Sequence, residues 1–226
     1  MKVTYKKNFS QSRNKIILNY CKWKKVLHIW ACDSPFTEKK YNWNSWPLLY
    51  REIDNICNEQ LWIDLDKNSI DFLNSKNEFK KSKIIFFDMN KLESLNFQPD
   101  IIIFWEVIEH LMNLEIALTN LKNIMNKNTL LIISTPNAFC INYFINILRN
   151  VEYVHEDHKV IFSTATLNNL LNSNWLDIEK IYYTLLDEDK NKLSMLWKIE
   201  RTIKQFIMKR KNGFASTLLY IVKKWK

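Results

Sequence analysis

The sequence predicts an α/β fold, in which a doubly wound, mostly parallel seven-stranded sheet has helices on both faces. Short apolar runs alternate with amphipathic segments along the chain, a pattern typical of βαβ units around a parallel sheet. Three of these runs are apolar almost throughout, as expected of strands that are covered on both faces. With 226 residues, 47% of them hydrophobic, the chain is long enough for one domain with a full core.

Seven segments are predicted to be strands. In chain order they are Lys25–Ile29, Gln60–Asp64, Lys83–Phe87, Ile101–Phe104, Thr129–Ser134, Ile178–Thr184 and Thr217–Val222. Between the fourth and fifth, apolar residues recur at helical spacing after Asn113, which is expected to cap that helix. A second helix is expected to begin near Ser163.

The chain contains no internal repeat and no linker rich in proline or glycine. We therefore expect residues 1–226 to form a single domain. Residues 1–20 are expected to be an N-terminal helical extension. Residues 190–211 are basic and amphipathic, and are expected to be a helical insertion before the last strand.

The net charge of +9 suits a polyanionic partner such as RNA, or an anionic membrane surface. The basic residues are spread along the whole chain, however, so a nucleic-acid partner is possible but not favoured. No apolar run approaches the roughly 20 residues that span a bilayer, and the N-terminus lacks the apolar core of a signal peptide. We expect a cytoplasmic protein whose four scattered cysteines are reduced thiols.

Acidic residues end two of the predicted strands. In doubly wound folds, ligands bind at the carboxyl ends of the strands, where the strand order reverses. Asp64 ends the second strand and is well placed to accept hydrogen bonds from both hydroxyls of a ribose. Asp88 follows the third strand, where an acid can also cap a helix.

From about Lys22 to its C-terminus, the chain resembles the class I S-adenosylmethionine-dependent methyltransferases. The resemblance rests on several motifs in the family's order, namely the acids at Asp64 and Asp88, "EVIEHL" at 106–111, "STPNAF" at 134–139, and "HEDH" at 155–158 followed by "FS" and "TL". It implies S-adenosylmethionine as cofactor and a last strand that runs antiparallel. The last of these motifs looks like a segment of family members that often modify small molecules or saccharides.

The resemblance also implies a set of site residues. The cofactor would contact His28, Ile29, Trp30, Ala31, Cys32, Asp33, Asp64, Leu65, Asp88, Met89 and Glu106. Asp64 would hold the ribose, and Asp88 would lie near the adenine. Asp64, Asp88, Glu106 and the loop at 29–33 are expected to ring one cleft at the carboxyl ends of the strands.

The reaction predicted is methyl transfer to a hydroxyl of a small molecule or saccharide. Glu106, His155 and His158 are the candidate catalytic residues. A histidine with a pKa near 6.5 can take a hydroxyl proton at neutral pH. The alternative is that the two histidines are simply exposed residues of a loop.

A metal site is the second interpretation of the same motifs. Glu106, Glu109 and His110 are spaced to converge on a helical turn, and with His158 they would offer a divalent cation two carboxylates and two imidazoles. Methyltransferases that act on small-RNA 3′ ends look similar, so an RNA 2′-O-methyltransferase is the alternative function. We favour a site without metal, in which Glu109 or His110 points away.

Tryptophan stands at several positions where the family has glycine, namely Trp23, Trp30, Trp62, Trp105 and Trp175. The chain has nine tryptophans and one glycine, Gly213, where average usage predicts about sixteen glycines. Either the protein is a catalytically dead relative with a blocked cofactor site, or UGA codons meant as glycine are read as tryptophan. We favour the second, because independent mutations would rarely choose the same bulky residue at every glycine position.

Overall fold

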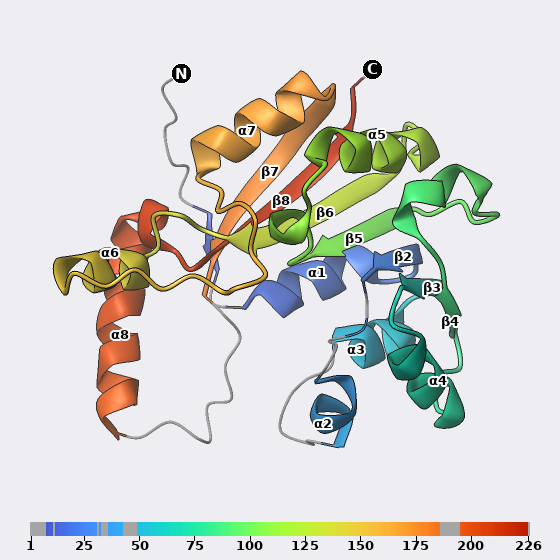
Figure 1. The fold of residues 1–226 in the computed structure, drawn as a ribbon, viewed down its shortest axis with the longest axis horizontal. Helices are drawn as coiled ribbons and strands as arrows, with labels where there is room; N and C mark the ends of the chain where they lie inside the picture. The colour runs from blue at the N-terminus through green and yellow to red at the C-terminus, as the bar shows by residue number, and fades with distance from the viewer. Residues whose placement is uncertain are drawn as a thin grey trace.

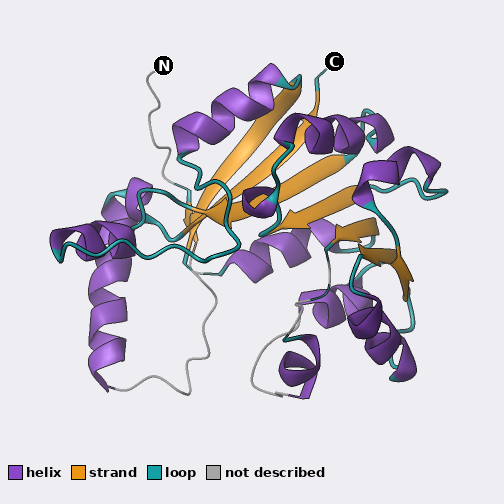
Figure 2. Ribbon diagram, in the orientation of Figure 1, coloured by secondary structure: helices purple, strands orange, loops and turns teal. Residues whose placement is uncertain are grey.

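The structure is a computed structural model that describes residues 8–10, 12–30, 32, 36–42, 49–185 and 195–225. Eight strands form one sheet in the order β1-β7-β8-β6-β5-β2-β3-β4 (Figures 1 and 2). The strands are β1 (Phe9–Ser10), β2 (Lys25–Ile29), β3 (Glu59–Asp64), β4 (Ser82–Phe86), β5 (Ile101–Trp105), β6 (Leu130–Pro136), β7 (Leu176–Thr184) and β8 (Thr217–Lys224). The α-helices are α1 (Arg13–Cys21), α2 (Thr37–Asn42), α3 (Leu49–Ile56), α4 (Lys67–Ser75), α5 (Leu114–Ile124), α6 (Ile141–Leu148), α7 (Thr164–Ser173) and α8 (Met195–Arg210).

The predicted fold is confirmed. All seven predicted strands are present, and only β8 runs antiparallel to its neighbours, β6 and β7. The sheet has one strand more than predicted, because Phe9–Ser10 pairs with the end of β7. Two residues are too few to show a periodicity, so the sequence gives no sign of this strand.

The N-terminal segment is only partly helical. Residues 1–7 and 11 lie outside the described residues, Phe9–Ser10 is a strand, and the helix covers Arg13–Cys21. The helix begins there because the Ser12 hydroxyl accepts a hydrogen bond from the Lys15 amide. The prediction of a helical extension over residues 1–20 was therefore wrong in its extent.

The sheet is covered on both faces, as the apolar strands require. On one face, α1 and α3 pack against β2, β5, β6 and β8 around Ile17, Ile53 and Ile103. On the other, α5 and α7 bury Leu118 and Leu167 against the same sheet (Figure 1). The result is three layers, helix–sheet–helix. Because β2 to β6 are parallel, their carboxyl ends lie at the same edge of the sheet.

The strand order reverses between β2 and β5. From β2 the chain proceeds outward through β3 to β4, then returns to place β5 on the other side of β2 and continues to β6. This reversal is the switch point, the place where open α/β sheets bind ligands. The loops after β2 and β5 begin at it, and the loop after β3 begins beside it.

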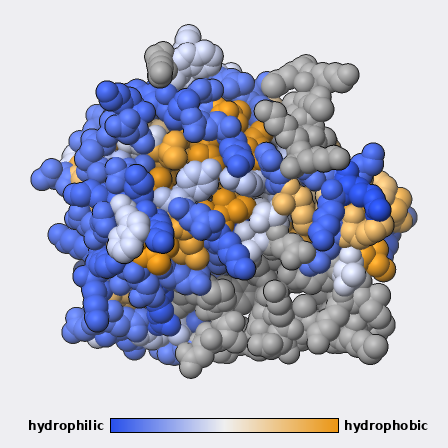
Figure 3. All heavy atoms as spheres, turned by 180° about the vertical axis from the view of Figure 1, so that it is seen from behind, coloured by the Kyte–Doolittle hydropathy of each residue, from blue (hydrophilic) through white to orange (hydrophobic). Residues whose placement is uncertain are grey.

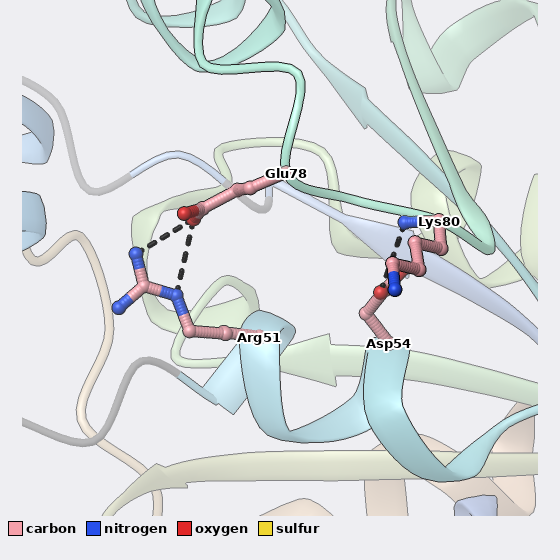
Figure 4. Close-up of polar contacts among 4 residues, drawn as sticks. All are labelled: Arg51, Asp54, Glu78 and Lys80. Carbon is pink, nitrogen blue, oxygen red and sulfur yellow. Dashed lines mark hydrogen bonds and ion pairs between the residues drawn. The ribbon is translucent and has the colours of Figure 1, made fainter.

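Polar contacts hold α3 to the segment that enters β4 (Figure 4). The Arg51 guanidinium donates two hydrogen bonds to one oxygen of Glu78, at 2.6 and 3.1 Å. The buried Asp54 carboxylate accepts from the amides of Lys80 and Lys81, at 3.2 and 2.9 Å. Asp54 is buried, and both of its carboxylate oxygens accept hydrogen bonds. These bonds therefore hold the start of β4, the edge strand next to β3, against α3.

Replacing Ser163 by alanine should destabilise the protein by about 1 kcal/mol. Ser163 and Thr166 form a reciprocal capping box at the start of α7, the helix predicted to begin there. Asn113 is the matched control: it precedes α5 as predicted, but its side chain makes no capping hydrogen bond. Asn113→Ala should therefore change the free energy of unfolding by less than about 0.5 kcal/mol, measured by urea denaturation. Equal losses from both variants would contradict this account.

The helix α8 lies inside the predicted insertion at 190–211, of which residues 190–194 fall outside the described residues. It precedes β8, as expected. Among the described helices, none combines the length and the apolar character needed to cross a membrane.

Candidate active site

Asp64 lies at the carboxyl end of β3 and is 7% exposed. One carboxylate oxygen accepts a hydrogen bond from the Cys32 amide at 2.8 Å. The other accepts from the amides of Leu65 and Asp66, at 2.7 and 2.9 Å. Burial raises the pKa of this carboxyl, and the three backbone N–H groups oppose that rise. Asp64 thus ties the loop after β2 to the end of β3, beside the switch point.

The other predicted cofactor residues divide into three groups. The side chains of His28, Ile29 and Met89 are buried in the layers of the fold, so only their backbone atoms can face a ligand. Leu65 is exposed, and Asp88 caps a short 3-10 helix by accepting from the Asn90 amide at 2.9 Å. The last two, at positions 31 and 33, lie outside the described residues.

Trp30 follows β2 directly and lies across the switch point. Its backbone has φ 54°, in the left-handed region. Its side chain packs against the main core, and its ring lies 6.2 Å from the ring of His110, in the loop after β5. The indole therefore lies at the carboxyl end of β2, close to the loop after β5, at the place where open α/β sheets bind ligands.

Glu106 follows β5 and is held by two partners. Its carboxylate forms an ion pair with the Arg13 guanidinium at 2.8 Å and accepts from the Ser134 hydroxyl at 2.9 Å. Arg13 comes from α1 and also stacks over Trp105, 4.7 Å from the ring centre. Sequence reasoning missed Arg13, because nothing in the pattern of α1 indicates which of its residues reaches the end of β5.

Three of the four candidate metal ligands gather in one place. Single ligand atoms of Glu109, His110 and His158 all lie within 4.8 Å of one another. The expectation that Glu109 or His110 would point away was therefore wrong. Glu106 is not in this group, since Arg13 and Ser134 hold its carboxylate.

The segment at 155–160 is docked onto Glu109. The amides of Lys159 and Val160 both donate to the Glu109 carbonyl, at 2.7 and 3.2 Å. His155 is exposed and lies beside His158, with ring centres 5.2 Å apart. Burial, followed by the charges of His110 and His155, lowers the pKa of His158. His158 is therefore neutral at pH 7 and able to accept a proton.

The Glu109 carboxyl group is almost fully buried, at 1% exposure. Neither of its oxygens has a hydrogen-bond partner of ordinary geometry among the described residues. Burial, followed by the charge of Glu106, raises the pKa of Glu109 to about 8, and Thr135 and Arg13 offset this only in part. The group is protonated in the folded protein at neutral pH.

Glu109 should make the protein less stable as the pH rises from 5 to 8. The folded state keeps a proton that the unfolded state loses near pH 4.5, so folding binds a proton across this range. We expect Glu109→Gln to reduce the pH dependence of the free energy of unfolding by roughly 3 kcal/mol between pH 5 and pH 8. Parallel urea titrations at the two pH values measure this. An unchanged slope would show that Glu109 is not the group responsible.

A cavity of about 240 Å³ lies between α6 and the segment that precedes the histidines. Tyr143, Ile147, Val151, Val154 and Ile161 are among its lining residues. Burial, followed by the charge of Cys140 and those of Glu106 and Glu109, raises the pKa of Tyr143. Apolar atoms gather at the surface on the side that α6 and α8 occupy (Figure 3).

The chain matches the model of a protein family described as "Methyltransferase domain" over residues 30–180, about two thirds of its length. No protein of curated function matches its sequence significantly. The match begins at the loop after β2 and ends within β7, so it includes Asp64, Glu106 and the three clustered histidines.

Several solved structures that resemble this chain are methyltransferases. A SAM-dependent methyltransferase from Archaeoglobus fulgidus is 22% identical, with a TM-score of 0.59 over 94% of this chain and 91% of that one. The N-methyltransferase NodS from Bradyrhizobium japonicum WM9, in complex with S-adenosyl-L-homocysteine, is 13% identical, with a TM-score of 0.56 over 95% and 86%. Magnesium protoporphyrin IX methyltransferase from Synechocystis PCC 6803, also with S-adenosyl-L-homocysteine bound, is 9% identical, with a TM-score of 0.60 over 93% and 81%.

The family match covers the sheet's switch point, and the fold is that of these structures. The chain therefore belongs to the methyltransferase-domain family, the class I S-adenosylmethionine-dependent methyltransferases.

Proposed function

We propose that this protein transfers a methyl group from S-adenosylmethionine to a hydroxyl of a small molecule or saccharide. The observation that carries the proposal is the position of Asp64. Its buried carboxylate ends β3 next to the switch point and already ties down the loop after β2. An acid at this position suits a ribose, because its oxygens can accept hydrogen bonds from two neighbouring hydroxyls.

The residues fit the cofactor at one side and not at the other. The Asp64 carboxylate at the end of β3 suits the ribose of an adenosine, and the exposed Leu65 beside it offers an apolar side chain to the adenine. At position 30 the fit fails, since an indole at the end of β2 packs against the core and lies near the ring of His110, in the loop after β5. The methionine part of the cofactor has to approach the backbone of this loop closely, which a large side chain prevents.

The acceptor is proposed to enter from the side of α6. The lining of the 240 Å³ cavity includes Val154 and Ile161, which flank the histidines at 155 and 158 in the chain. An acceptor bound there would have its hydroxyl near the histidines. Methyl transfer mainly requires that the acceptor be aligned with the methyl donor. The residues that line this cavity would therefore contribute to catalysis mainly by positioning the acceptor.

His158 is proposed to take the hydroxyl proton. It is neutral at pH 7, it is half-buried, and it lies next to His110, with ring centres 4.9 Å apart. His155 is more exposed and can relay the proton to solvent. Glu106 is proposed to orient the acceptor, because Arg13 and Ser134 hold its carboxylate in a fixed position.

An RNA 2′-O-methyltransferase is the second candidate. The gathering of Glu109, His110 and His158 favours it, because one carboxylate and two imidazoles suit a divalent cation such as Mn²⁺ or Zn²⁺. Both Glu109 oxygens are free of ordinary hydrogen bonds among the described residues and would gain a partner. Metal binding would also require the Glu109 carboxyl to lose its proton.

The test is labelled methyl transfer from S-adenosylmethionine to a panel of saccharides, small hydroxylated molecules and single-stranded RNA. The enzyme is the chain with glycine at position 30. His158→Asn should lower kcat about 100-fold and leave cofactor binding unchanged, while His155→Asn should have a smaller effect. Unchanged turnover by His158→Asn would contradict the role of His158. Transfer to RNA 3′ ends that depends on added Mn²⁺ would favour the second candidate instead.

A further inference from the structure

Three tryptophans have a left-handed backbone. Their φ values are 60° at Trp23, 54° at Trp30 and 59° at Trp175. In this region the Cβ atom of an L-residue crowds the following carbonyl oxygen, so glycine is the residue that adopts it routinely. Only six non-glycine residues in the described part of the chain have a positive φ. Half of them are therefore tryptophan, which has no local means of relieving the strain.

Two of these tryptophans follow helix ends. Trp23 comes after the C-terminal cap of α1, and Trp175 after that of α7. The same position is Asn77 after α4 and Asn150 after α6, with φ 52° and 56°. This position is usually glycine and sometimes asparagine. At these four helix ends the left-handed residue is asparagine twice and tryptophan twice. Tryptophan therefore takes the place that glycine usually has.

Two further tryptophans have indole N–H groups that are poorly accommodated. The indole nitrogens of Trp62 and Trp105 are buried and have no hydrogen-bond partner among the described residues. A buried donor without a partner is costly. Glycine at either position would remove the orphaned group.

We infer that the native residue at positions 23, 30, 62, 105 and 175 is glycine, encoded by UGA codons that the source organism decodes as glycine. Composition supports this independently of the fold, since one glycine and nine tryptophans reverse the usual proportions. At positions 23, 30 and 175 the inference stands on the backbone, and at 62 and 105 it stands on the unpartnered indole N–H groups. It does not rest on the proposed function. At position 30 it has a functional consequence, because glycine removes the indole from the switch point and leaves the loop open to a cofactor.

The direct test is the nucleotide sequence, together with the mass of the native protein. We expect UGA at all five codons, and at most or all of the other four tryptophan codons. Peptides from the native protein that contain these positions should have the mass of the glycine form. UGG codons, or native peptides that contain tryptophan, would overturn the inference.

A second test measures the backbone itself in the full chain. Trp23 and Trp175 are 64% and 65% exposed, so their removal costs little burial. Trp23→Gly and Trp175→Gly should each raise Tm by about 2–4 °C. The matched controls Asn77→Gly and Asn150→Gly should raise it less, because asparagine tolerates this conformation. A fall in Tm for both tryptophan variants would contradict the inference.

The two tests separate this inference from the proposed function. If the codons are UGA and the glycine form does not bind S-adenosylmethionine, the inference stands and the function fails. If they are UGG and the Trp30→Gly variant binds the cofactor, the inference fails and the proposed site stands.

Discussion

The unsubstituted chain should not bind S-adenosyl-L-homocysteine. The Trp30→Gly variant should bind it with a dissociation constant of roughly 1–100 µM. The indole of Trp30 lies at the end of β2, near the ring of His110 in the loop after β5. Removing it frees the place where the cofactor has to meet the backbone. At 100 times the dissociation constant, the ligand should stabilise the variant by about 2.7 kcal/mol and raise Tm by about 5–10 °C.

The matched control is Trp175→Gly. It makes the same substitution at another left-handed position, at the amino end of β7 and away from the switch point. This variant should show no rise in Tm with ligand. Equal ligand-induced shifts in the unsubstituted chain and in Trp30→Gly would contradict the claim that the indole blocks the site.

Asp64→Asn, made in the chain with glycine at position 30, should weaken S-adenosylmethionine binding by on the order of 100-fold, about 3 kcal/mol. The carboxylate would lose charge-assisted hydrogen bonds to the ribose, and the new amide would direct an N–H group toward existing N–H donors. The Cys32 amide would lose its partner at 2.8 Å as well, so the loop after β2 should loosen. Isothermal titration calorimetry measures the affinity.

Asp71→Asn supplies the control for charge. Asp71 lies on the exposed face of α4 and the substitution removes the same unit of charge. Its affinity for S-adenosylmethionine should stay within about threefold of the parent chain. Thermal unfolding without ligand shows whether Asp64→Asn remains folded at the assay temperature. Tight binding by a folded Asp64→Asn variant would show that the ribose lies elsewhere.

The strands were predictable because their apolar runs are long enough to be recognised. Every strand from β2 to β8 was identified to within about two residues, and α7 begins where Ser163 predicted it. The central strands β5 and β6 are buried on both faces, which requires them to be apolar almost throughout, and that is visible in the sequence. The strand β1 has only two residues, and nothing in its composition distinguishes it.

The site was predictable only in part. Asp64 could be placed because the end of a strand fixes where its side chain lies. The contact between Arg13 and Glu106 joins residues 93 positions apart, through the packing of α1 against the sheet. The convergence of His158 with Glu109 depends on how a loop docks, and the bonds from Lys159 and Val160 that determine it are made by backbone atoms. Backbone contacts of this kind leave no trace in residue type.

The most direct test of the central claim is a crystal structure of the chain with glycine at position 30, bound to S-adenosyl-L-homocysteine. We predict that the ligand lies at the carboxyl ends of β2, β3 and β5, with both ribose hydroxyls within hydrogen-bond distance of the Asp64 carboxylate. A ligand seated in the cavity beside α6, or a ribose with no contact to Asp64, would contradict the account.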